Sequence, residues 1–260
     1  MNQRLVYITG ASSGIGQALA QRYARAGWRL ALVARRPEEL QRWAEAQGLP
    51  AGRIEVYAAD VRQVDSIVGA GLACIARQGL PDVVIASAGI SVGMDSSVRE
   101  DLEVLRDVLA TNNLGVAATF HPFIAAMRQR RSGRLVGIAS VSAIRGLPGH
   151  GAYCASKAAV VAYCESLRGE CRADGVRVVT LLPGYIATPL TARNPYRMPF
   201  LISAAEFAER AFDAIERGSS YRVIPWQMAV LAKLLRLLPN ALFDAIVAGR
   251  GRKPRRSAAP

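Results

Sequence analysis

Cysteine and histidine are scarce in this sequence. It has four cysteines, none of them in a Cys-x-x-Cys pair, and two histidines, His121 and His150. Structural zinc sites draw on closely spaced pairs of these residues, so the sequence argues against a metal centre. We expect the cysteines to be free thiols that pack in the interior: Cys74, Cys154, Cys164 and Cys171.

The first residues, MNQRLVYITG, lack the long apolar run and the small-residue cleavage site of a signal peptide. We therefore expect a cytoplasmic protein in a reducing compartment. Residues 226–247 are strongly apolar, but Lys233, Arg236, Pro239 and Asp244 interrupt them, which argues against a spanning helix. Two amphipathic helices broken at Pro239 are predicted instead. They would suit peripheral contact with the inner membrane surface, packing on a partner subunit, or capping of the chain's own substrate cleft.

Acidic residues are also few. Aspartate and glutamate number 20 against 33 lysines and arginines, which gives a formal charge of +13 and a pI near 10.3. We expect no nucleic-acid partner, because no zinc-finger spacing, aromatic RNA-binding pattern or heptad-linked basic region accompanies the charge. Residues 249–260, GRGRKPRRSAAP, contain no acid and predict a mobile basic tail: Arg250, Arg252, Lys253, Arg255 and Arg256.

Short apolar runs alternate with longer helical patterns along the chain. This alternation is typical of βαβ units, in which helices cover both faces of a parallel sheet. We predict a doubly wound, mostly parallel α/β sheet of about seven strands, at residues 5–9, 29–34, 54–58, 83–86, 135–139, 177–182 and 221–224. Helical patterns lie near residues 16–26, 37–47, 64–78, 102–127, 153–174 and 204–217. We expect one dinucleotide-binding and catalytic domain over residues 1–225, followed by an apolar amphipathic segment with a basic tail over residues 226–260.

A glycine-rich turn, TGASSGIG over residues 9–16, follows the first predicted strand. Glycines let the backbone approach a phosphate closely, and the start of the next helix offers unpaired N–H groups and a partial positive charge. A tight turn without a ligand would contain similar glycines, so the turn alone leaves both interpretations open. In the first interpretation the phosphates of a dinucleotide bind at Gly10, Ser12, Ser13, Gly14, Ile15 and Gly16.

The T-G-x-x-x-G-x-G spacing resembles that of the short-chain dehydrogenase/reductase family, and further motifs follow in the family's order. They are Asp60-Val61, Ala86-Ser87-Ala88-Gly89, Asn112, Ser140, Tyr153-x-x-x-Lys157, and Pro183-Gly184-Tyr185-Ile186-Ala187-Thr188-Pro189. The resemblance covers residues 4 to about 190. It implies a Rossmann-like fold and further cofactor contacts at Asp60, Val61, Ala88, Gly89, Asn112, Tyr153, Lys157, Pro183, Gly184, Ile186 and Thr188. The sequence departs from the family in one motif, A-S-A-G in place of N-N-A-G, which should alter local sheet support more than catalysis.

Two arginines, Arg35 and Arg36, follow the second predicted strand and bear on the choice of cofactor. An acid there would bind the ribose 2′-OH and repel a 2′-phosphate, whereas a guanidinium suits a phosphate dianion. We therefore expect NADP(H), with Arg35 as the main partner and Arg36 beside it. Alternatively, both arginines pair with Glu38 and Glu39. Asp60 also has two interpretations, a contact to the adenine amino group or a cap at the strand end.

Tyr153 and Lys157 are four residues apart and so share one face of a predicted helix. The ammonium should favour the phenolate and lower the pKa of Tyr153. Ser140 ends a predicted strand thirteen residues before Tyr153, which matches the family's spacing, and Ser142 is its rival. By resemblance, Ser140 binds the substrate oxygen, Lys157 also binds the nicotinamide ribose, and Asn112 supports a water chain to Lys157. Together these residues imply hydride transfer between nicotinamide and a carbonyl or secondary alcohol.

By resemblance, residues from about 185 to 217 carry the substrate lid. Its apolar side chains either favour an apolar or lipid-like substrate or simply pack the lid on the body: Tyr196, Met198, Phe200 and Leu201. His150 is interpreted as an exposed loop residue rather than a substrate contact. The family also implies a homodimer or homotetramer, formed through the long helices that bear Asn112 and Tyr153. The main rival function is a non-catalytic dinucleotide-binding redox sensor or scaffold on the same fold.

Overall fold

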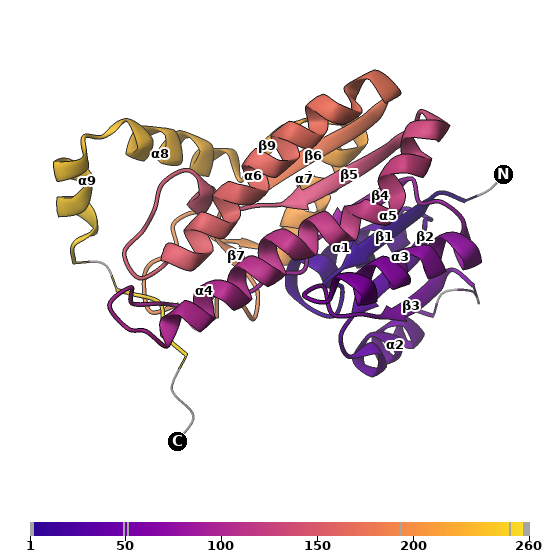
Figure 1. Cartoon of the computed structure of the whole chain (residues 1–260), viewed down its shortest axis with the longest axis horizontal. Helices are drawn as coiled ribbons and strands as arrows, with labels where there is room; N and C mark the ends of the chain where they lie inside the picture. Colours follow the sequence, from indigo (N-terminus) through magenta and orange to yellow (C-terminus); the bar gives the residue numbers. More distant parts are fainter. Residues whose placement is uncertain (1–2, 49, 51, 193, 250, 257–260) are drawn as a thin grey trace.

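The computed structural model describes residues 3–48, 50, 52–192, 194–249 and 251–256. Its centre is a seven-stranded parallel sheet in the order β3-β2-β1-β4-β5-β6-β9 (Figure 1). The strands are β1 (Leu5–Thr9), β2 (Arg29–Ala34), β3 (Ile54–Ala58), β4 (Val83–Ala86), β5 (Gly133–Ile138), β6 (Val176–Pro183) and β9 (Tyr221–Ile224). The predicted doubly wound α/β sheet is confirmed.

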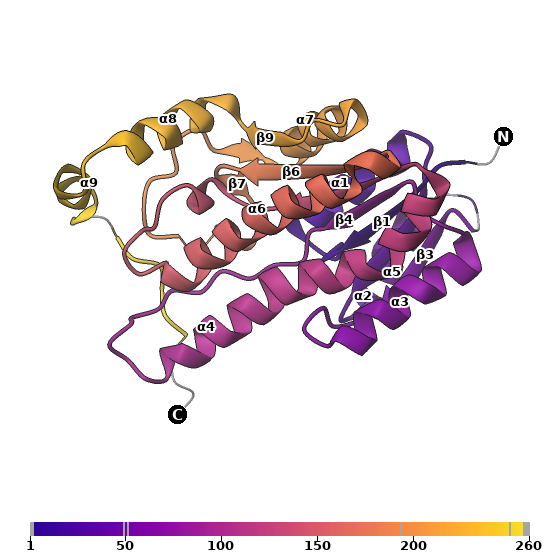
Figure 2. The same cartoon turned by 45° about the horizontal axis from the view of Figure 1, so that its top comes forward.

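Helices cover both faces of this sheet (Figures 1 and 2). One face carries α1 (Gly14–Arg25), α2 (Pro37–Ala46) and α7 (Ala204–Arg217), and the other carries α3 (Val64–Gln78), α5 (Gly115–Arg130) and α6 (Gly151–Cys171). Side chains of β1 alternate between the two resulting cores: Tyr7 packs against Phe123 with ring centroids 4.8 Å apart, and Ile8 joins the core that contains Leu19 and Phe207. The four cysteines are free and buried, as expected.

The strand order reverses at β1, which pairs with β2 on one side and with β4 on the other. In such sheets the loops after the two strands lead to opposite faces and leave a crevice at the carboxyl ends. The glycine-rich turn after β1 and the A-S-A-G segment after β4 therefore meet at one edge of the sheet.

The helical pattern expected over residues 102–127 is interrupted. It forms α4 (Asp101–Leu109) and α5, joined by a π-helical turn over Ala110–Leu114. A π turn holds one residue more than an α turn, and its wider hydrogen-bond ring frees backbone groups from the regular pattern. Asn112 lies in this turn.

The C-terminal part contains α8 (Trp226–Leu237) and α9 (Asn240–Val247), separated at Pro239 as predicted. In Figures 1 and 2 both helices lie at the end of the molecule away from β3 and α2. Among the residues that the structure describes, no helix is long and apolar enough to cross a membrane. The short strands β7 (Ile186–Ala187) and β8 (Ile202–Ser203) pair at the base of the predicted lid.

The prediction of a mobile basic tail is wrong for residues 251–256. Arg255 donates from Nε and Nη2 to the two oxygens of the buried Asp101 carboxylate, at 2.6 and 3.2 Å, and Arg256 pairs with Asp107 at 2.9 Å. Arg255 and Arg256 dock because α4 supplies two acids, Asp101 and Asp107, which the tail itself lacks. Arg250, residues 257–260 and Arg193 of the lid lie outside the described residues.

Candidate active site

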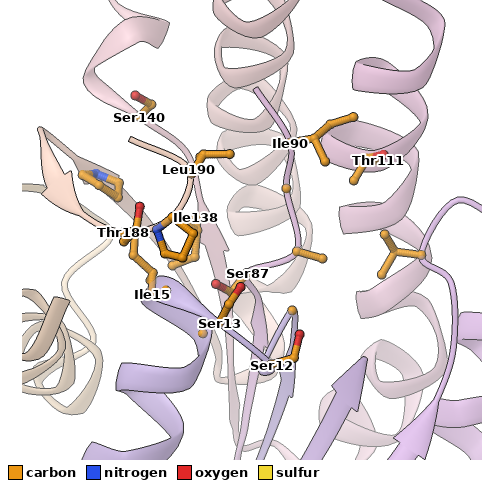
Figure 3. Close-up of a pocket in the computed structure, with 18 of the residues that line it drawn as sticks. Ser12, Ser13, Ile15, Ser87, Ile90, Thr111, Ile138, Ser140, Thr188 and Leu190 are labelled. Atoms are coloured by element: carbon orange, nitrogen blue, oxygen red, sulfur yellow. The ribbon is translucent and has the colours of Figure 1, made fainter. Parts of the chain in front are cut away.

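A cleft of about 590 Å³ opens at the carboxyl ends of the central strands. In Figure 3 the Ser12-Ser13 turn forms one end of it and Ser140 lies at the other, with Ile90 and Leu190 on its two sides. The cleft brings together all but two of the residues predicted to form the site: Gly10, Ser12, Ser13, Gly14, Ile15, Gly16, Arg35, Asp60, Val61, Ala88, Gly89, Ser140, Tyr153, Lys157, Pro183, Gly184, Ile186 and Thr188. The two exceptions are Arg36 and Asn112.

The glycine-rich turn leaves no room for side chains at its first and last glycine. A Cβ at Gly10 would lie 2.7 Å from the Cα of Ala88, and one at Gly16 would lie 2.2 Å from the Gly10 carbonyl oxygen. Gly10 and Gly14 also have φ of +66° and +56°, where side chains are disfavoured. The turn is therefore packed backbone against backbone and leads directly into α1, whose first residues line the cleft.

The A-S-A-G segment is supported by a hydroxyl of the neighbouring strand. Thr9 Oγ1 accepts hydrogen bonds from the backbone N–H groups of Ser87 and Ala88, at 3.2 and 3.4 Å. The last residue, Gly89, lies beside the lysine of the site: a Cβ there would be 3.5 Å from Lys157 Nζ. The departure from N-N-A-G thus leaves the segment anchored to β1.

Ser140, Tyr153 and Lys157 converge on the cleft from two elements. Ser140 follows β5, and its Oγ accepts a hydrogen bond from the backbone N–H of Ser142 at 3.1 Å. Tyr153 and Lys157 lie one turn apart on α6. Lys157 is buried, and its Nζ donates to the carbonyl of Ile138 at 2.8 Å. Of the two candidate serines, only Ser140 is among the residues that line this cleft.

The expected effect of Lys157 on Tyr153 is wrong for the structure as it stands. Burial raises the pKa of Tyr153 to about 12, and only its hydrogen bond with Ser140 opposes that rise appreciably. Burial also lowers the pKa of Lys157 to about 8. The ammonium lies 5.7 Å from the centre of the Tyr153 ring and is directed to the backbone of β5, so desolvation outweighs charge attraction.

Asn112 lies behind the cleft and is fully buried in the π-helical turn. Its Oδ1 accepts from the Ile90 N–H at 2.9 Å, and its Nδ2 donates to the Ile90 carbonyl and to Ser156 Oγ at 3.0 and 2.9 Å. The side chain therefore joins the segment after β4 to α6. This amide holds the loop that faces Lys157 in place.

Of the two arginines after β2, only Arg35 lines the cleft. Arg36 is exposed and pairs with Glu39 at 3.2 Å, which matches the alternative interpretation for that residue. Sequence reasoning missed Arg62, which also lines the cleft and pairs with Asp60 at 2.7 Å. This hydrogen-bonded pair is the main reason that the pKa of Asp60 is lowered. Asp60 also accepts from the Arg62 N–H, as in a strand-end cap.

The first residues of the lid, such as Leu190, line this cleft, but the four apolar side chains singled out in the sequence do not. Tyr196 and Met198 are half-buried, whereas Phe200 and Leu201 are exposed. His150 is not the exposed loop residue that was expected: it is buried, and its Nε2 lies 3.2 Å from the Tyr196 hydroxyl. The loop before α6 and the lid are thus joined.

The C-terminal residues 251–256 close one side of the cleft. Lys253 Nζ donates to Ser91 Oγ at 3.0 Å and to the Leu190 carbonyl at 3.3 Å, and so connects the segment after β4 with the lid. The Gly93 N–H donates to the Pro254 carbonyl at 3.1 Å. Arg256 itself lines the cleft. Sequence reasoning missed these contacts because they join residues far apart in the chain.

Comparison with known proteins identifies this arrangement. The family model described as short chain dehydrogenase matches residues 4–197. The chain belongs to the short-chain dehydrogenase family. An uncharacterized oxidoreductase from Myxococcus xanthus is 38% identical over 94% of this chain and 96% of its own length. Dehydrogenase/reductase SDR family member 7B from Mus musculus is 31% identical over 99% of this chain and 84% of its own.

Two solved enzyme structures have the same fold. The alcohol dehydrogenase of Thermococcus sibiricus, complexed with 5-hydroxy-NADP, is 26% identical with a TM-score of 0.76 over 85% of this chain and 96% of its own. An actinorhodin polyketide ketoreductase variant with NADPH is 26% identical with a TM-score of 0.77 over 85% and 95%. The chain is an oxidoreductase that acts on CH–OH or C=O groups with a nicotinamide dinucleotide.

Proposed function

We propose that the chain is an NADP(H)-dependent carbonyl reductase, or the reverse alcohol dehydrogenase, acting on an apolar or lipid-like substrate. The observation that carries this is the meeting of Ser140, Tyr153 and buried Lys157 in a cleft that the glycine-rich turn also lines. Such a turn fits a pyrophosphate, because any side chain at Gly10 or Gly16 would displace backbone.

The glycine turn, Asp60, Val61, Ala88, Gly89 and the segment after β6 would hold the cofactor, which would supply a hydride for the carbonyl carbon. Tyr153 donates its phenolic proton to the carbonyl oxygen, so the product is a neutral alcohol. Ser140 donates a hydrogen bond to the same oxygen as negative charge develops there. Lys157 binds the ribose and returns a proton to Tyr153, and Asn112 holds the path by which protons reach Lys157.

The choice of NADP(H) over NAD(H) rests on Arg35 and on Arg62. Both line the cleft, Arg62 pairs with Asp60, and the two positions directly after β2 hold arginines rather than an acid. Arg35 is exposed and its charge acts on Asp60, which places a second cation near the Asp60–Arg62 pair. Two guanidiniums at that point suit a 2′-phosphate. The two solved relatives described above, which carry 5-hydroxy-NADP and NADPH, agree with this proposal.

The substrate end of the cleft is apolar on both sides, at Ile90 and Leu190. Together with the apolar lid this supports a substrate with a hydrocarbon portion. We assign residues 1–225 to the catalytic domain, with its lid near residues 185–217, and residues 226–260 to an apolar amphipathic C-terminal segment with a basic tail.

A homodimer or homotetramer through the long helices is part of the same proposal. Exposed leucines lie along that surface at Leu102 and Leu109 of α4 and at Leu114 of the π turn. Apolar side chains of this kind are typical of subunit interfaces when they form one patch. Light scattering on the purified chain measures the assembly directly.

The deciding experiment is NADPH consumption by the wild type and by Tyr153→Phe across acyl, aromatic and steroid-like carbonyls. The variant should lose about 100-fold or more in kcat, because it lacks the transferable proton. Its NADPH affinity, measured by fluorescence, should stay near the wild-type value. Retention of a tenth of the wild-type rate would contradict the role of Tyr153, and NADPH binding without turnover in the wild type would favour a redox sensor.

A further inference from the structure

Helix α8 presents apolar side chains on the face that it turns away from the body. Trp226, Val230, Leu234 and Leu237 are exposed, at 63% for Trp226 and 80% for Leu237. Their spacing of four, four and three residues places them in one stripe, which we call the apolar face. Met228 and Ala232, on the other side of the helix, are buried against the body. The fold therefore uses one side of α8 and leaves the apolar face uncovered within the described chain.

Helix α9 also has exposed apolar side chains. Leu242 and Ile246 are both more than half exposed and are one turn apart, whereas Phe243 and Val247 of the same helix are buried. A single exposed leucine is ordinary on a protein surface, but a cluster on two successive helices is typical of a docking surface.

Cations predominate on α8 itself, whereas α9 carries one exposed acid, Asp244. Helix α8 contains no acid, and Lys233 and Arg236 are exposed beside the stripe. A hollow of about 310 Å³ where α8 begins is lined by Trp226 together with Arg210, Arg217 and Arg222, and its acid, Asp213, already pairs with Arg217. Apolar side chains flanked by excess positive charge match the two layers of an anionic bilayer surface, where headgroups lie above acyl chains.

The two C-terminal helices are fixed to the catalytic body rather than loosely attached. The Arg145 guanidinium donates to the carbonyls of Leu235 and Leu238 and to Asn240 Oδ1, and it stacks on the Phe243 ring at 3.8 Å. Helix α8 also packs on Val141–Ala143, directly after Ser140. Arg145 thus holds the turn between α8 and α9 against the loop that carries the candidate site.

We propose that the apolar face of α8 docks on an anionic phospholipid bilayer, with Lys233 and Arg236 at the headgroups. A second copy of the chain fits less well as the occupant. In a two-fold contact the same face meets itself, which would bring Lys233 and Arg236 of both copies together with no acid on α8 to neutralise them. A bilayer instead supplies the opposite charge and a hydrocarbon layer at once.

Because α8 packs on Val141–Ala143, docking would bring the membrane near the loop that follows Ser140. If the proposed function holds, an apolar carbonyl compound dissolved in the bilayer reaches the cleft without crossing water. Membrane docking does not depend on the reaction, so an experiment that contradicts docking leaves the proposed reductase activity untouched, and the reverse also holds.

The test is co-sedimentation of the full chain with phosphatidylcholine vesicles, with and without phosphatidylserine. We expect binding to require phosphatidylserine and to weaken as the salt concentration is raised, because salt screens the attraction between Lys233, Arg236 and the anionic headgroups. The double variant Leu234→Glu with Leu237→Glu should bind at least tenfold less. The matched control is Leu72→Glu on α3, another exposed leucine at 54%, given the same kind of change. It should bind nearly as the wild type does.

A further variant, Lys233→Gln with Arg236→Gln, should lose most of the dependence on phosphatidylserine. All variants should melt like the wild type and keep the wild-type rate on a water-soluble carbonyl. Equal vesicle binding by the double glutamate variant and the Leu72→Glu control would overturn the proposal, as would absence of binding by the wild type. If the glutamates instead turn an oligomer into a monomer in light scattering, a second copy covers the face and the bilayer proposal is wrong.

Discussion

The glycine turn after β1 and the C-terminal residues 251–256 border the same cleft but are held there by opposite means. The turn is fixed by backbone contacts between neighbouring residues and adjacent strands, so its shape follows from where glycine stands in a short stretch of sequence. The C-terminal residues have one backbone hydrogen bond to Gly93, but they depend mainly on side chains that reach acids about 150 residues earlier, such as Arg255 to Asp101. An added side-chain atom at the glycines of the turn should therefore disrupt the turn. Removal of single side-chain contacts should weaken the docking of residues 251–256 only gradually.

The largest expected effect is that of Gly16→Ala. The new Cβ would meet the backbone oxygen of Gly10 at 2.2 Å, which cannot move without shifting the turn. Overpacking of this kind costs about 1–3 kcal/mol, and cofactor affinity should fall with it. Gly69→Ala in α3 is the control, because a Cβ there meets nothing within 4 Å, and it should stabilise the chain by roughly 0.5–1 kcal/mol. Thermal melting and NADPH titration compare the two, and equal losses would contradict the backbone packing.

A smaller effect is expected from Arg35→Asp, which changes charge in the cleft without touching the turn. Replacing attraction by repulsion of a 2′-phosphate should shift the ratio of kcat/KM for NADPH and NADH by about tenfold or more towards NADH. Arg36→Asp makes the same charge change on the neighbouring residue, which is exposed and paired with Glu39, and should leave the ratio nearly unchanged. If both variants shift the ratio equally, the general charge of the loop decides cofactor choice and the assignment to Arg35 is wrong.

The smallest effect is expected from Arg255→Ala, which should loosen the C-terminal residues while the sheet stays intact. Trypsin should then cleave after Arg252 or Arg256 several times faster, as mass spectrometry can follow, with no change in melting temperature. Arg256→Ala, whose acid partner is more exposed than Asp101, should have less effect on cleavage after Arg252. A cleavage rate equal to that of the wild type in both variants would show that other contacts hold this segment.

The same contact predicts a dependence on pH. The hydrogen bonds from Arg255 lower the pKa of Asp101, so the carboxylate is favoured when the segment is docked. The Asp101–Arg255 pair therefore stabilises docking fully at a pH above the ordinary pKa of an aspartate. This stabilisation is lost as the pH falls through the lowered pKa of Asp101. Cleavage of the segment by an acid-active protease should therefore accelerate on acidification in the wild type and change less in Asp101→Asn.

Local patterns in the sequence were enough to predict the sheet and the glycine turn, because strand periodicity and glycine position act over short distances. The grouping of Ser140 with Tyr153 and Lys157 depended also on the resemblance to the family's motif spacing. The π turn at Asn112 was not predictable, since its residues have an ordinary helical pattern. Neither was the docking of the C-terminal residues, because the acids that receive the arginines are distant in the chain. Burial of His150 was missed for the same reason: its neighbour Tyr196 belongs to the lid.

Gly93 and residues 251–256 are far apart in the sequence, but their contact predicts that they vary together among related proteins. It does not need the left-handed conformation that favours glycine, yet a Cβ there would lie 2.0 Å from the carbonyl oxygen of Lys253. Glycine is required at position 93 only while a chain segment lies on it. Related sequences that lack an equivalent of residues 251–256 should therefore accept larger residues at that position, and those that keep the segment should keep the glycine.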